Sequence, residues 1–242
     1  MSADKQTPDK GEKIYEGKAK SVFATSDPGL YIQSFKDDAS AFNGIKKGTI
    51  VEKGVMNSAV SSAVFAMLEE NGVKTHLVKK LSDRDQLIKK VEIIPVEVVV
   101  RNIVAGSLAK RMGRPEGEKL KSTIIEFYYK DDELGDPMIN EDHIGVFGLA
   151  TESEMAVIKK SAMTVNELLV KMFKDIGLDL VDFKLEYGRH EGEVILADEI
   201  SMDTCRLWDT KTGEKMDKDR FRFDLGKVEE AYREVTERIL KK

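Results

Sequence analysis

The sequence predicts an α+β fold of two lobes, a small antiparallel-sheet lobe followed by a larger α+β lobe. Strand patterns dominate residues 13–36, whereas the longest helical pattern lies at residues 151–176. Strands that precede helices are typical of α+β chains, because doubly wound chains alternate the two. With 242 residues, the chain can form one large domain or two lobes that share a cleft. We place a boundary at Pro95, so that a polar tail and two lobes comprise residues 1–12, 13–95 and 96–242.

The first lobe is expected to begin with an antiparallel meander. Three strand-like runs come first, at residues 13–15, 20–25 and 30–35. A turn at Asp27-Pro28-Gly29 separates the last two runs, and a loop at residues 37–44 follows. A helix at residues 54–70 has apolar residues at helical spacing and stops at Asn71-Gly72. Two further strands are expected, at residues 77–81 and 86–94.

The second lobe is expected to contain the longest helix of the chain, at residues 151–176. A capping box from Thr151 to Glu154 predicts its start. The other elements expected are a buried strand at residues 96–101 and a short helix at residues 106–113. A hairpin at residues 181–200 and a last helix at residues 225–240 follow. Phe42, Trp208 and the methionine-rich helices are assigned to the core rather than to a site.

Composition excludes several classes of protein. The formal net charge of -5 argues against a general nucleic-acid binder, which usually carries a basic field. Cys205 is the single cysteine, so no internal disulfide can form and a reducing cytoplasm is expected. No run approaches the ~18 apolar residues that span a bilayer, and the polar start lacks the apolar segment of a signal peptide. We expect a cytoplasmic homo-oligomer, with a dimer favoured and without nucleic-acid or membrane partners.

Charged side chains are concentrated in two neighbouring runs, residues 181–188 and 196–209. In the first run, alternation places Asp182, Lys184 and Glu186 on one face of a strand. The second run adds five charged residues, Asp198, Glu199, Asp203, Arg206 and Asp209. Carboxylates that alternate with cations beside apolar strands suit a metal-assisted site for anionic substrates. The alternative is a half-solvated hairpin whose charges face water.

The register of this hairpin decides which carboxylates can share a metal ion. With the shortest turn through residues 188–192, Asp182 lies opposite Asp198 and Glu186 lies nearer the turn. Glu186 and Asp198 can then meet one magnesium ion only through a bulge or a longer connection, and two separate ions are the other arrangement. The sequence leaves the register open.

Two further segments can bind anions, although neither G-x-x-x-x-G-K-[ST] nor G-x-G-x-x-G occurs. In the Gly-Lys-Ala-Lys run at residues 17–20, a glycine turn exposes backbone N–H groups beside two ammonium groups. The alternative is a plain hairpin turn. Arg101 ends a valine-rich strand, and the helix that opens at Gly106-Ser107 has free N–H groups. Here the alternative is that Ser107 caps the helix and Arg101 forms a surface ion pair.

Four blocks resemble the signatures of the SAICAR synthetase family, the phosphoribosylaminoimidazole-succinocarboxamide synthases of purine biosynthesis. They are residues 15–20, 95–108, 181–188 and 196–209, in the order and spacing of the family. The resemblance runs from Lys13 to the C-terminus. One departure is Met202, where many members have proline, but it removes no charged group. The resemblance implies the two-lobed fold above, with ATP in the cleft and an outline similar to protein kinases.

The resemblance also implies roles for individual residues. Those expected to bind the nucleotide are Gly17, Lys18, Ala19, Lys20, Ile93 and Glu97. Of these, Ile93 is expected to line the adenine pocket. Those expected to bind the other substrates are Ser40, Arg101, Ser107, Asp136, Asp203 and Arg206. Lys184 and Arg206 are the expected catalytic residues, and Glu186 and Asp198 are the expected ligands of a magnesium cofactor.

The reaction that the resemblance implies joins 5-amino-1-(5-phosphoribosyl)imidazole-4-carboxylate to L-aspartate, with ATP becoming ADP and phosphate. A carboxylate is a poor electrophile, so ATP would first convert it to an acyl phosphate, from which the aspartate amine would displace phosphate. One alternative is a small-molecule kinase that phosphorylates a hydroxyl in the same cleft. The other is a non-catalytic nucleotide-binding or scaffold protein, which should lack the metal carboxylates and the central arginine that this chain keeps. No residue is assigned to aspartate binding or to a general base.

Overall fold

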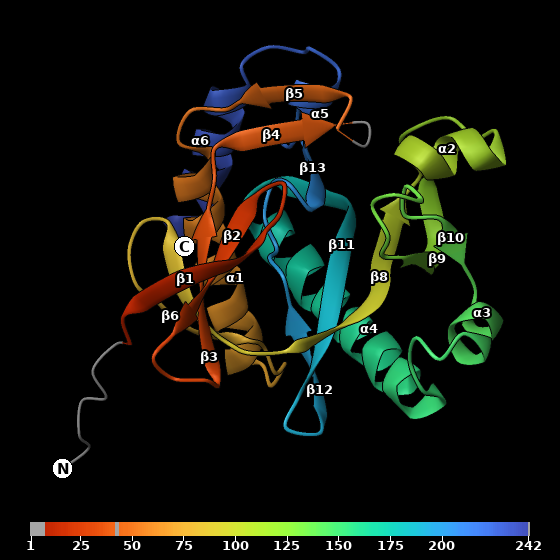
Figure 1. Ribbon diagram of the computed structural model, residues 1–242. Coiled ribbons are helices and arrows are strands. Elements are labelled where there is room, and N and C mark those ends of the chain that lie inside the picture. Colours follow the sequence, from red (N-terminus) through yellow and green to blue (C-terminus); the bar gives the residue numbers. More distant parts are fainter. Residues whose placement is uncertain (1–7, 42–43, 242) are drawn as a thin grey trace.

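The computed structural model describes residues 8–41 and 44–241 and has the expected α+β fold (Figure 1). A five-stranded antiparallel sheet forms the first lobe, in the order β1-β2-β3-β7-β6. Its strands are β1 Lys10–Glu16, β2 Lys20–Thr25, β3 Leu30–Phe35, β6 Leu77–Lys80 and β7 Asp85–Lys89. The predicted meander is therefore confirmed. Because β1 begins at Lys10, residues 10–12 of the expected tail belong to the sheet, while residues 1–7 lie outside the described part.

The loop expected at residues 37–44 is instead largely part of a small two-stranded sheet. β4 (Asp38–Ala41) pairs with β5 (Lys46–Thr49). The alanines of β4 are buried, whereas Ser40 between them faces a cleft. Alanine, serine and glycine have low strand propensity, so only the pairing with β5 reveals this strand. Phe42, expected in the core, lies outside the described residues.

The second sheet is larger and has the strand order β10-β9-β8-β11-β12, with β13 also paired to β11. Its strands are β8 Glu92–Ile103, β9 Lys119–Tyr129, β10 Met138–Ile139, β11 Leu178–His190, β12 Glu193–Ala197 and β13 Cys205–Asp209. β11 is the central strand. β8 pairs with one edge of it, while β12 and β13 share the other edge.

The chain passes from the first sheet to the second between β7 and β8. The single strand expected at residues 86–94 is therefore wrong, because the apolar run is split between two sheets. At the break, the Lys90 N–H donates to the Gly29 carbonyl at 2.8 Å. Pro95 lies inside β8, and the division into lobes at this residue stays a prediction.

Helices cover the outer faces of both sheets. α1 (Lys53–Glu70) packs against α6 (Val228–Leu240), and α4 (Glu152–Asp175) lies across the second sheet (Figure 1). The capping box at the start of α4 is confirmed, because the Thr151 and Glu154 side chains each accept from the backbone N–H of the other. The short helices are α2 Gly106–Met112, α3 Glu141–Val146 and α5 Asp219–Arg222.

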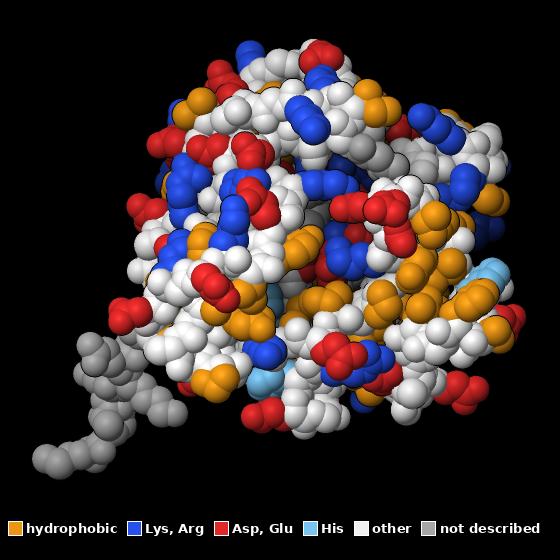
Figure 2. All heavy atoms as spheres, in the orientation of Figure 1, with side chains coloured by type: hydrophobic (Ala, Val, Ile, Leu, Met, Phe, Trp, Pro, Cys, Tyr) orange, Lys and Arg blue, Asp and Glu red, His pale blue; other side chains and the backbone are white. Residues whose placement is uncertain are grey.

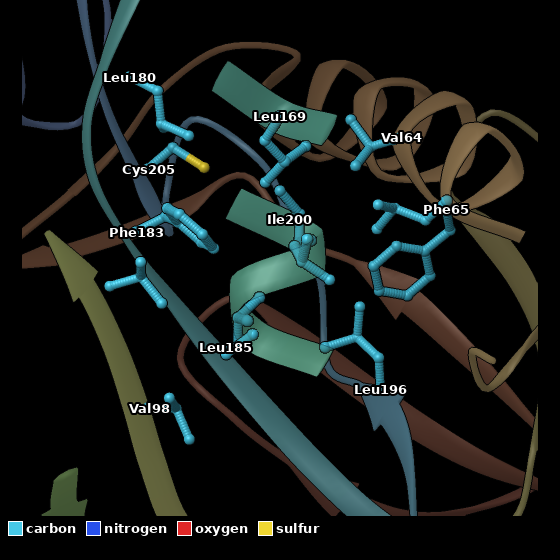
Figure 3. Packing of buried hydrophobic residues seen from close by; sticks show 14 of the residues in the cluster. Val64, Phe65, Val98, Leu169, Leu180, Phe183, Leu185, Leu196, Ile200 and Cys205 are labelled. Atoms are coloured by element: carbon cyan, nitrogen blue, oxygen red, sulfur yellow. The ribbon is translucent and has the colours of Figure 1, made fainter. Parts of the chain in front are cut away.

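One apolar core joins the helices to the strands. Side chains from α1, α4, β11 and β12 converge in it, including those of Val64, Leu169, Leu185 and Leu196 (Figure 3). The strands that carry the charged residues are thereby held on their apolar faces. Within the described ranges, no helix has both the length and the apolar character needed to cross a membrane.

The turn between β11 and β12 sets the register of the charged residues. His190 pairs with Glu193, so the turn consists of Glu191 and Gly192. Their φ angles are 49° and 82°, as the two central residues of a type I′ turn require. The turn therefore lies further along the chain than the shortest turn through residues 188–192 would place it.

This register brings Glu186 and Asp198 together without a bulge between β11 and β12. Glu186 pairs with Ala197, which directly precedes Asp198. The expected pairing of Asp182 with Asp198 is wrong, because the later turn leaves Asp182 beyond the end of β12. Asp182 pairs with β13 on that side of the strand.

Candidate active site

A cleft of about 840 Å³ is lined by residues from both sheets. Figure 2 shows a hollow on this face in which basic and acidic side chains meet. Every residue predicted for the site lies in its wall, namely Gly17, Lys18, Ala19, Lys20, Ser40, Ile93, Glu97, Arg101, Ser107, Asp136, Lys184, Glu186, Asp198, Asp203 and Arg206. The fold thus gathers residues that are distant in the sequence, while their individual roles stay predictions.

Lys184, on β11, is the centre of a cluster of carboxylates. Its Nζ is 2.8 Å from Glu97 Oε1 and 2.5 Å from Glu186 Oε1. Asp198 Oδ2 lies 3.7 Å away, and Lys130 donates to the same Glu186 oxygen at 3.0 Å. Although burial opposes the charge, the carboxylates, Glu186 first, raise the pKa of Lys184 well above its usual value. Lys184 is therefore a fixed positive charge that holds three acidic side chains close together.

The turn between β1 and β2 brings Lys20 to the same cluster. The Gly17 N–H donates to the Lys20 carbonyl at 2.8 Å, which closes the turn. The Lys20 ammonium contacts the carboxylates of Asp198 and Glu199. Burial raises the pKa of Asp198, but the charges of Lys20 and Lys184 outweigh it and hold that pKa well below its usual value. Asp198 is therefore ionised and lies between two cations.

Other predicted residues lie nearer the rim of the cleft. The Lys18 ammonium is 2.7 Å from Asp132, and both side chains are largely exposed. Ile93 is also exposed. Asp136 has a φ of 51°, and its carboxylate accepts from the Asp131 N–H at 3.0 Å. Lys18 and Ile93 are therefore accessible from solvent as well as lining the cleft.

Arg101, on β8, belongs to a second cluster and is buried. Its guanidinium donates to Glu126 at 2.7 Å, to Asp182 at 2.8 Å and to Ser107 Oγ at 3.0 Å. The alternative of a surface ion pair is wrong, because Arg101 is only 3% exposed. Ser107 does not cap α2 either, since the residue in the cap position is Ala105. Arg101 and Ser107 are instead in direct contact within the wall of the cleft.

Arg206, on β13, completes this cluster. One of its nitrogens donates to both Asp182 oxygens, at 2.8 and 3.0 Å, and another donates to Asp219 at 2.9 Å. Burial opposes the charge, but Asp182 and then Asp219 raise the pKa of Arg206 above its usual value. Gly106 has a φ of 53°, and a Cβ there would come within 2.7 Å of the guanidinium. Glycine is therefore required where α2 meets Arg206.

Asp203 is held from the core side of the cleft. Its carboxylate accepts from the Lys53 ammonium and from the Tyr232 hydroxyl, both at 2.7 Å. Burial raises the pKa of Asp203, but the cations Lys218 and Lys53 outweigh it and keep that pKa well below its usual value. Trp208, expected in the core, is only partly buried and does not line the cleft.

Sequence reasoning missed several charged residues of the cleft and its supports. They are Glu126, Lys130, Asp132, Lys218, Asp219 and Arg222. Most follow or lie on β9 and α5, which the sequence pattern did not predict. Asp182 also lines the cleft and was not assigned to the site, although alternation placed it on the face of Lys184 and Glu186.

A two-lobed α+β fold with a large cleft of paired cations and carboxylates defines an enzyme for several anionic small molecules. The model of one family, described as SAICAR synthetase, matches residues 13–239. The chain belongs to the SAICAR synthetase family, which confirms the resemblance carried by the four blocks.

Known proteins match over nearly their whole length. A phosphoribosylaminoimidazole-succinocarboxamide synthase of Magnetococcus marinus is 58% identical over 95% of this chain and 96% of its own. One from Chlorobium luteolum is 60% identical over 94% of this chain and 95% of its own. The crystal structure of the synthase from Ehrlichia chaffeensis has a TM-score of 0.92 at 50% identity, covering 94% of this chain and 98% of its own. A SAICAR synthetase in complex with ADP has a TM-score of 0.91 at 48% identity, covering 94% and 97%.

Proposed function

We propose that this cleft joins L-aspartate to 5-amino-1-(5-phosphoribosyl)imidazole-4-carboxylate, giving the succinocarboxamide, ADP and phosphate. Membership of the SAICAR synthetase family makes the chain an ATP-dependent ligase of purine biosynthesis. The complex of a related structure with ADP supports a nucleotide in the cleft. The observation that carries the proposal is the pair of charged clusters, around Lys184 and around Arg101 with Arg206, in one cleft.

The chemistry runs in two steps. An oxygen of the imidazole carboxylate bonds to the γ-phosphorus of ATP, and the bond to the bridging oxygen breaks, so that ADP leaves. The aspartate amine then attacks the acyl carbon, phosphate leaves with the electron pair of the C–O bond, and the nitrogen loses a proton. Both steps bring several anions together, so cations that are fixed in advance lower the barrier. Lys184, which its carboxylates keep protonated, would take this role beside the carboxylate that reacts.

We assign the nucleotide to the side of the cleft that the first sheet forms. The N–H groups of the turn at residues 17–20, with the ammonium groups of Lys18 and Lys20, would bind its phosphates. Ile93 and Glu97 would contact the nucleotide where β8 begins. Exposure of Ile93 and its position in the cleft wall support an apolar contact with the adenine ring.

We assign the phosphoribosyl group to the arginine cluster. Asp182 contacts both Arg101 and Arg206, and Ser107 contacts Arg101, which supports a shared role of the three side chains in binding an anion. Ser40, Asp136 and Asp203 would contact the substrates from other parts of the same wall.

Glu186 and Asp198 would hold magnesium. Their carboxylates approach the same Lys184 nitrogen at 2.5 and 3.7 Å, so they lie close enough to serve one cation. Among residues 8–41 and 44–241, no three His, Cys, Asp or Glu side chains are grouped to hold a metal ion. Two carboxylates fit magnesium, because this ion usually completes its shell with waters and substrate phosphates. When bound, it would neutralise phosphate charge.

The test of the reaction is a trapping experiment. With ATP, magnesium and the imidazole carboxylate but without aspartate, hydroxylamine should yield a hydroxamate at the carboxylate carbon, because an acyl phosphate is electrophilic there. With aspartate, amide and ADP should form in equal amounts. Lys184→Met should suppress both products, since it removes the cation beside the reacting carboxylate.

The kinase alternative has a different outcome. It would give ADP and a stable phosphorylated alcohol, unaffected by aspartate or hydroxylamine, and that result would rule out the ligase.

A cytoplasmic location and a homodimer stay predictions. The free thiol of Cys205 is buried, which is compatible with a reducing compartment.

A further inference from the structure

A polar triad lies on the face of the second sheet opposite the cleft. Its members are Asn102 on β8, Thr123 on β9 and Asn166 on α4, and no step of the reaction above uses them. Asn102 directly follows Arg101, and successive side chains on a strand point to opposite faces. Arg101 accordingly lines the cleft, whereas Asn102 lines a second cavity of about 560 Å³, which residues of α4 also line.

The Asn102 amide uses its full hydrogen-bonding capacity. Its Oδ1 accepts from Thr123 Oγ1 at 3.1 Å and from Asn166 Nδ2 at 3.2 Å. Its Nδ2 donates to Asn166 Oδ1 at 2.8 Å and to the Leu180 carbonyl at 3.3 Å. The Leu180 carbonyl can only accept, which fixes the orientation of the amide. One side chain of β8 is therefore bonded to β9, α4 and β11.

The triad lies where the pairing of β8 with β9 is interrupted. The two strands pair at Arg101 and again at Ile103, and between these pairs β9 has four residues where β8 has only Asn102. Such a bulge leaves hydrogen bonds of the ladder unmade. The hydrogen bond from Thr123 to Asn102 lies within the interruption and ties the two strands together there.

The pairing of β11 is interrupted at the same level. Asp182 pairs with Arg101 in the end pair of the ladder between β11 and β8. On its other edge, β11 has one extra residue between Leu180 and Asp182, so its pairing with β13 shifts there. The Leu180 carbonyl accepts from Asn102, which connects β8 to β11 beyond the end pair. The amide therefore holds the end of β8 on both sides, directly after the residue that belongs to the arginine cluster.

Directional bonding explains why amides occupy this position. Asn166 is 5% exposed, and the other buried residues of α4 are apolar. Apolar side chains would pack α4 against the sheet without the desolvation cost of amides. Hydrogen bonds require defined distances and angles, and a fully bonded buried network specifies one arrangement of the groups that it joins. The triad thus favours one spacing of the strands rather than simply tighter packing of the helix.

We propose that Asn102 is a positioning residue for the arginine cluster: its amide holds the end of β8 so that Arg101 keeps the spacing from Asp182 that the imidazole nucleotide requires. Asn102 acts from the far face of the sheet and does not contact the substrate. The two carboxylates that hold Arg101 lie on the strands on either side of β8, so a displaced β8 would alter both contacts together. This inference rests on the proposed function, which assigns the phosphoribosyl group to Arg101.

The experiment replaces each member of the triad by an apolar side chain of similar size. In Asn102→Leu, Asn166→Leu and Thr123→Val, the KM for the imidazole carboxylate should rise by about fivefold or more, because a displaced guanidinium binds its ligand less well. The KM values for ATP and aspartate, and kcat, should each change by less than about twofold, because the Lys184 cluster keeps its contacts. Calorimetry with the imidazole nucleotide alone should show the same loss of affinity without turnover.

Conservative variants show whether the hydrogen bonds themselves matter. Thr123→Ser keeps the hydroxyl and should retain most of the affinity that Thr123→Val loses. Asn102→Leu combined with Thr123→Val should raise the KM no further than Asn102→Leu alone, because the two side chains act as one unit. Thr123→Val is the mildest change and decides the question if melting curves show that either leucine variant is unfolded.

Two control variants separate positioning from stability. Glu167→Gln should keep every parental value, because Glu167 is next to Asn166 and lines the same cavity but forms no ion pair within residues 8–41 and 44–241. Val165→Ala should lower the melting temperature, because it opens a cavity beneath α4 at a fully buried apolar residue. It leaves the triad intact and should therefore keep the three KM values.

The outcomes separate this inference from the proposed function. A parent enzyme that forms neither hydroxamate nor amide contradicts the proposed function. A parent that forms both, while the folded triad variants keep the parental KM for the imidazole carboxylate, overturns the positioning role and leaves the ligase intact. Equal increases in all three KM values also overturn it. So does a Val165→Ala enzyme whose KM for the imidazole carboxylate rises as much as that of Asn102→Leu, because a general loosening of α4 would then explain the effect.

Discussion

Asp182 accepts hydrogen bonds from one nitrogen of Arg206 at both of its carboxylate oxygens, at 2.8 and 3.0 Å. Arg101 donates to one of the same oxygens at 2.8 Å. Asp182 is 4% exposed and lies on β11, between the strands that carry the two arginines. A single buried carboxylate therefore fixes the spacing of two guanidinium groups, and it neutralises part of their charge when no substrate is bound.

Asp182→Asn should weaken binding of the imidazole nucleotide by about 2–5 kcal/mol, because both guanidinium groups lose the charge that positions them. Binding of ATP should change little. Calorimetry with each ligand measures the two effects separately. Asp179→Asn, on the same strand but paired with the exposed Lys174, is the control and should change neither affinity. Equal losses for both ligands would indicate a disturbed fold rather than a positioning role.

Arg101→Ala and Ser107→Ala should weaken the same ligand to different extents. Loss of the buried guanidinium should cost about 2–5 kcal/mol of binding free energy. Loss of the Ser107 hydroxyl should cost about 1 kcal/mol, because Arg101 keeps its contacts to Glu126 and Asp182. Titration of each variant with the imidazole nucleotide and with ATP tests the ranking. A larger loss for ATP would place these residues in the nucleotide site.

Glu186→Gln and Asp198→Asn should each reduce the apparent affinity for magnesium by about tenfold or more, because a neutral amide is a poor ligand for this ion. Turnover is measured at limiting and at saturating magnesium, with melting curves for each variant. Glu193→Gln, at an exposed site on β12 paired with Lys74, is the control. Parental turnover of either variant at limiting magnesium would show that the residue does not bind the metal.

Local signals predicted the parts of the fold that depend on neighbouring residues. The start of α4 followed from its capping box, and the first meander followed from short strands and a turn. β9 was missed although its isoleucine, phenylalanine and tyrosine residues favour a strand. β4 was missed because its residues have no local pattern that separates them from a loop, and pairing with β5 stabilises it. The break between β7 and β8 was missed for the related reason that one apolar run serves two sheets.

The candidate site shows the same limit. Alternation placed Asp182, Lys184 and Glu186 on one face, and the structure lines all three along the cleft. Which cation contacts which carboxylate depends on strand pairing. In the structure the hairpin turn lies at Glu191 and Gly192, later than the shortest expected turn, and the register therefore differs from the expected one. The contact of Asp182 with both arginines needs three strands in register, which no local pattern can specify.

Glu154→Gln should lower the free energy of unfolding at neutral pH, and this loss should diminish in acid. The Glu154 carboxylate accepts from Arg189 and from the backbone N–H of Thr151. Glutamine can still accept from that N–H in the capping box, so the variant removes chiefly the ion pair between α4 and β11.

The pH dependence of this loss has a definite sign. The hydrogen bond from Arg189 is the largest cause that lowers the pKa of Glu154 from 4.5 to about 2. An acid whose pKa is lower in the folded state binds fewer protons there than in the unfolded state, so its stabilising contribution is complete above the ordinary value of 4.5. It is lost as the pH falls toward about 2.

Urea unfolding of parent and variant across this pH range measures the effect. The two unfolding free energies should converge as Glu154 becomes protonated. Glu152→Gln is the control, because Glu152 is exposed in the same helical turn and forms no ion pair within residues 8–41 and 44–241. A difference between parent and Glu154→Gln that stays constant from neutral pH into acid would mean that the variant acts through packing or capping, and that the charge of Glu154 adds nothing to the stability of the fold.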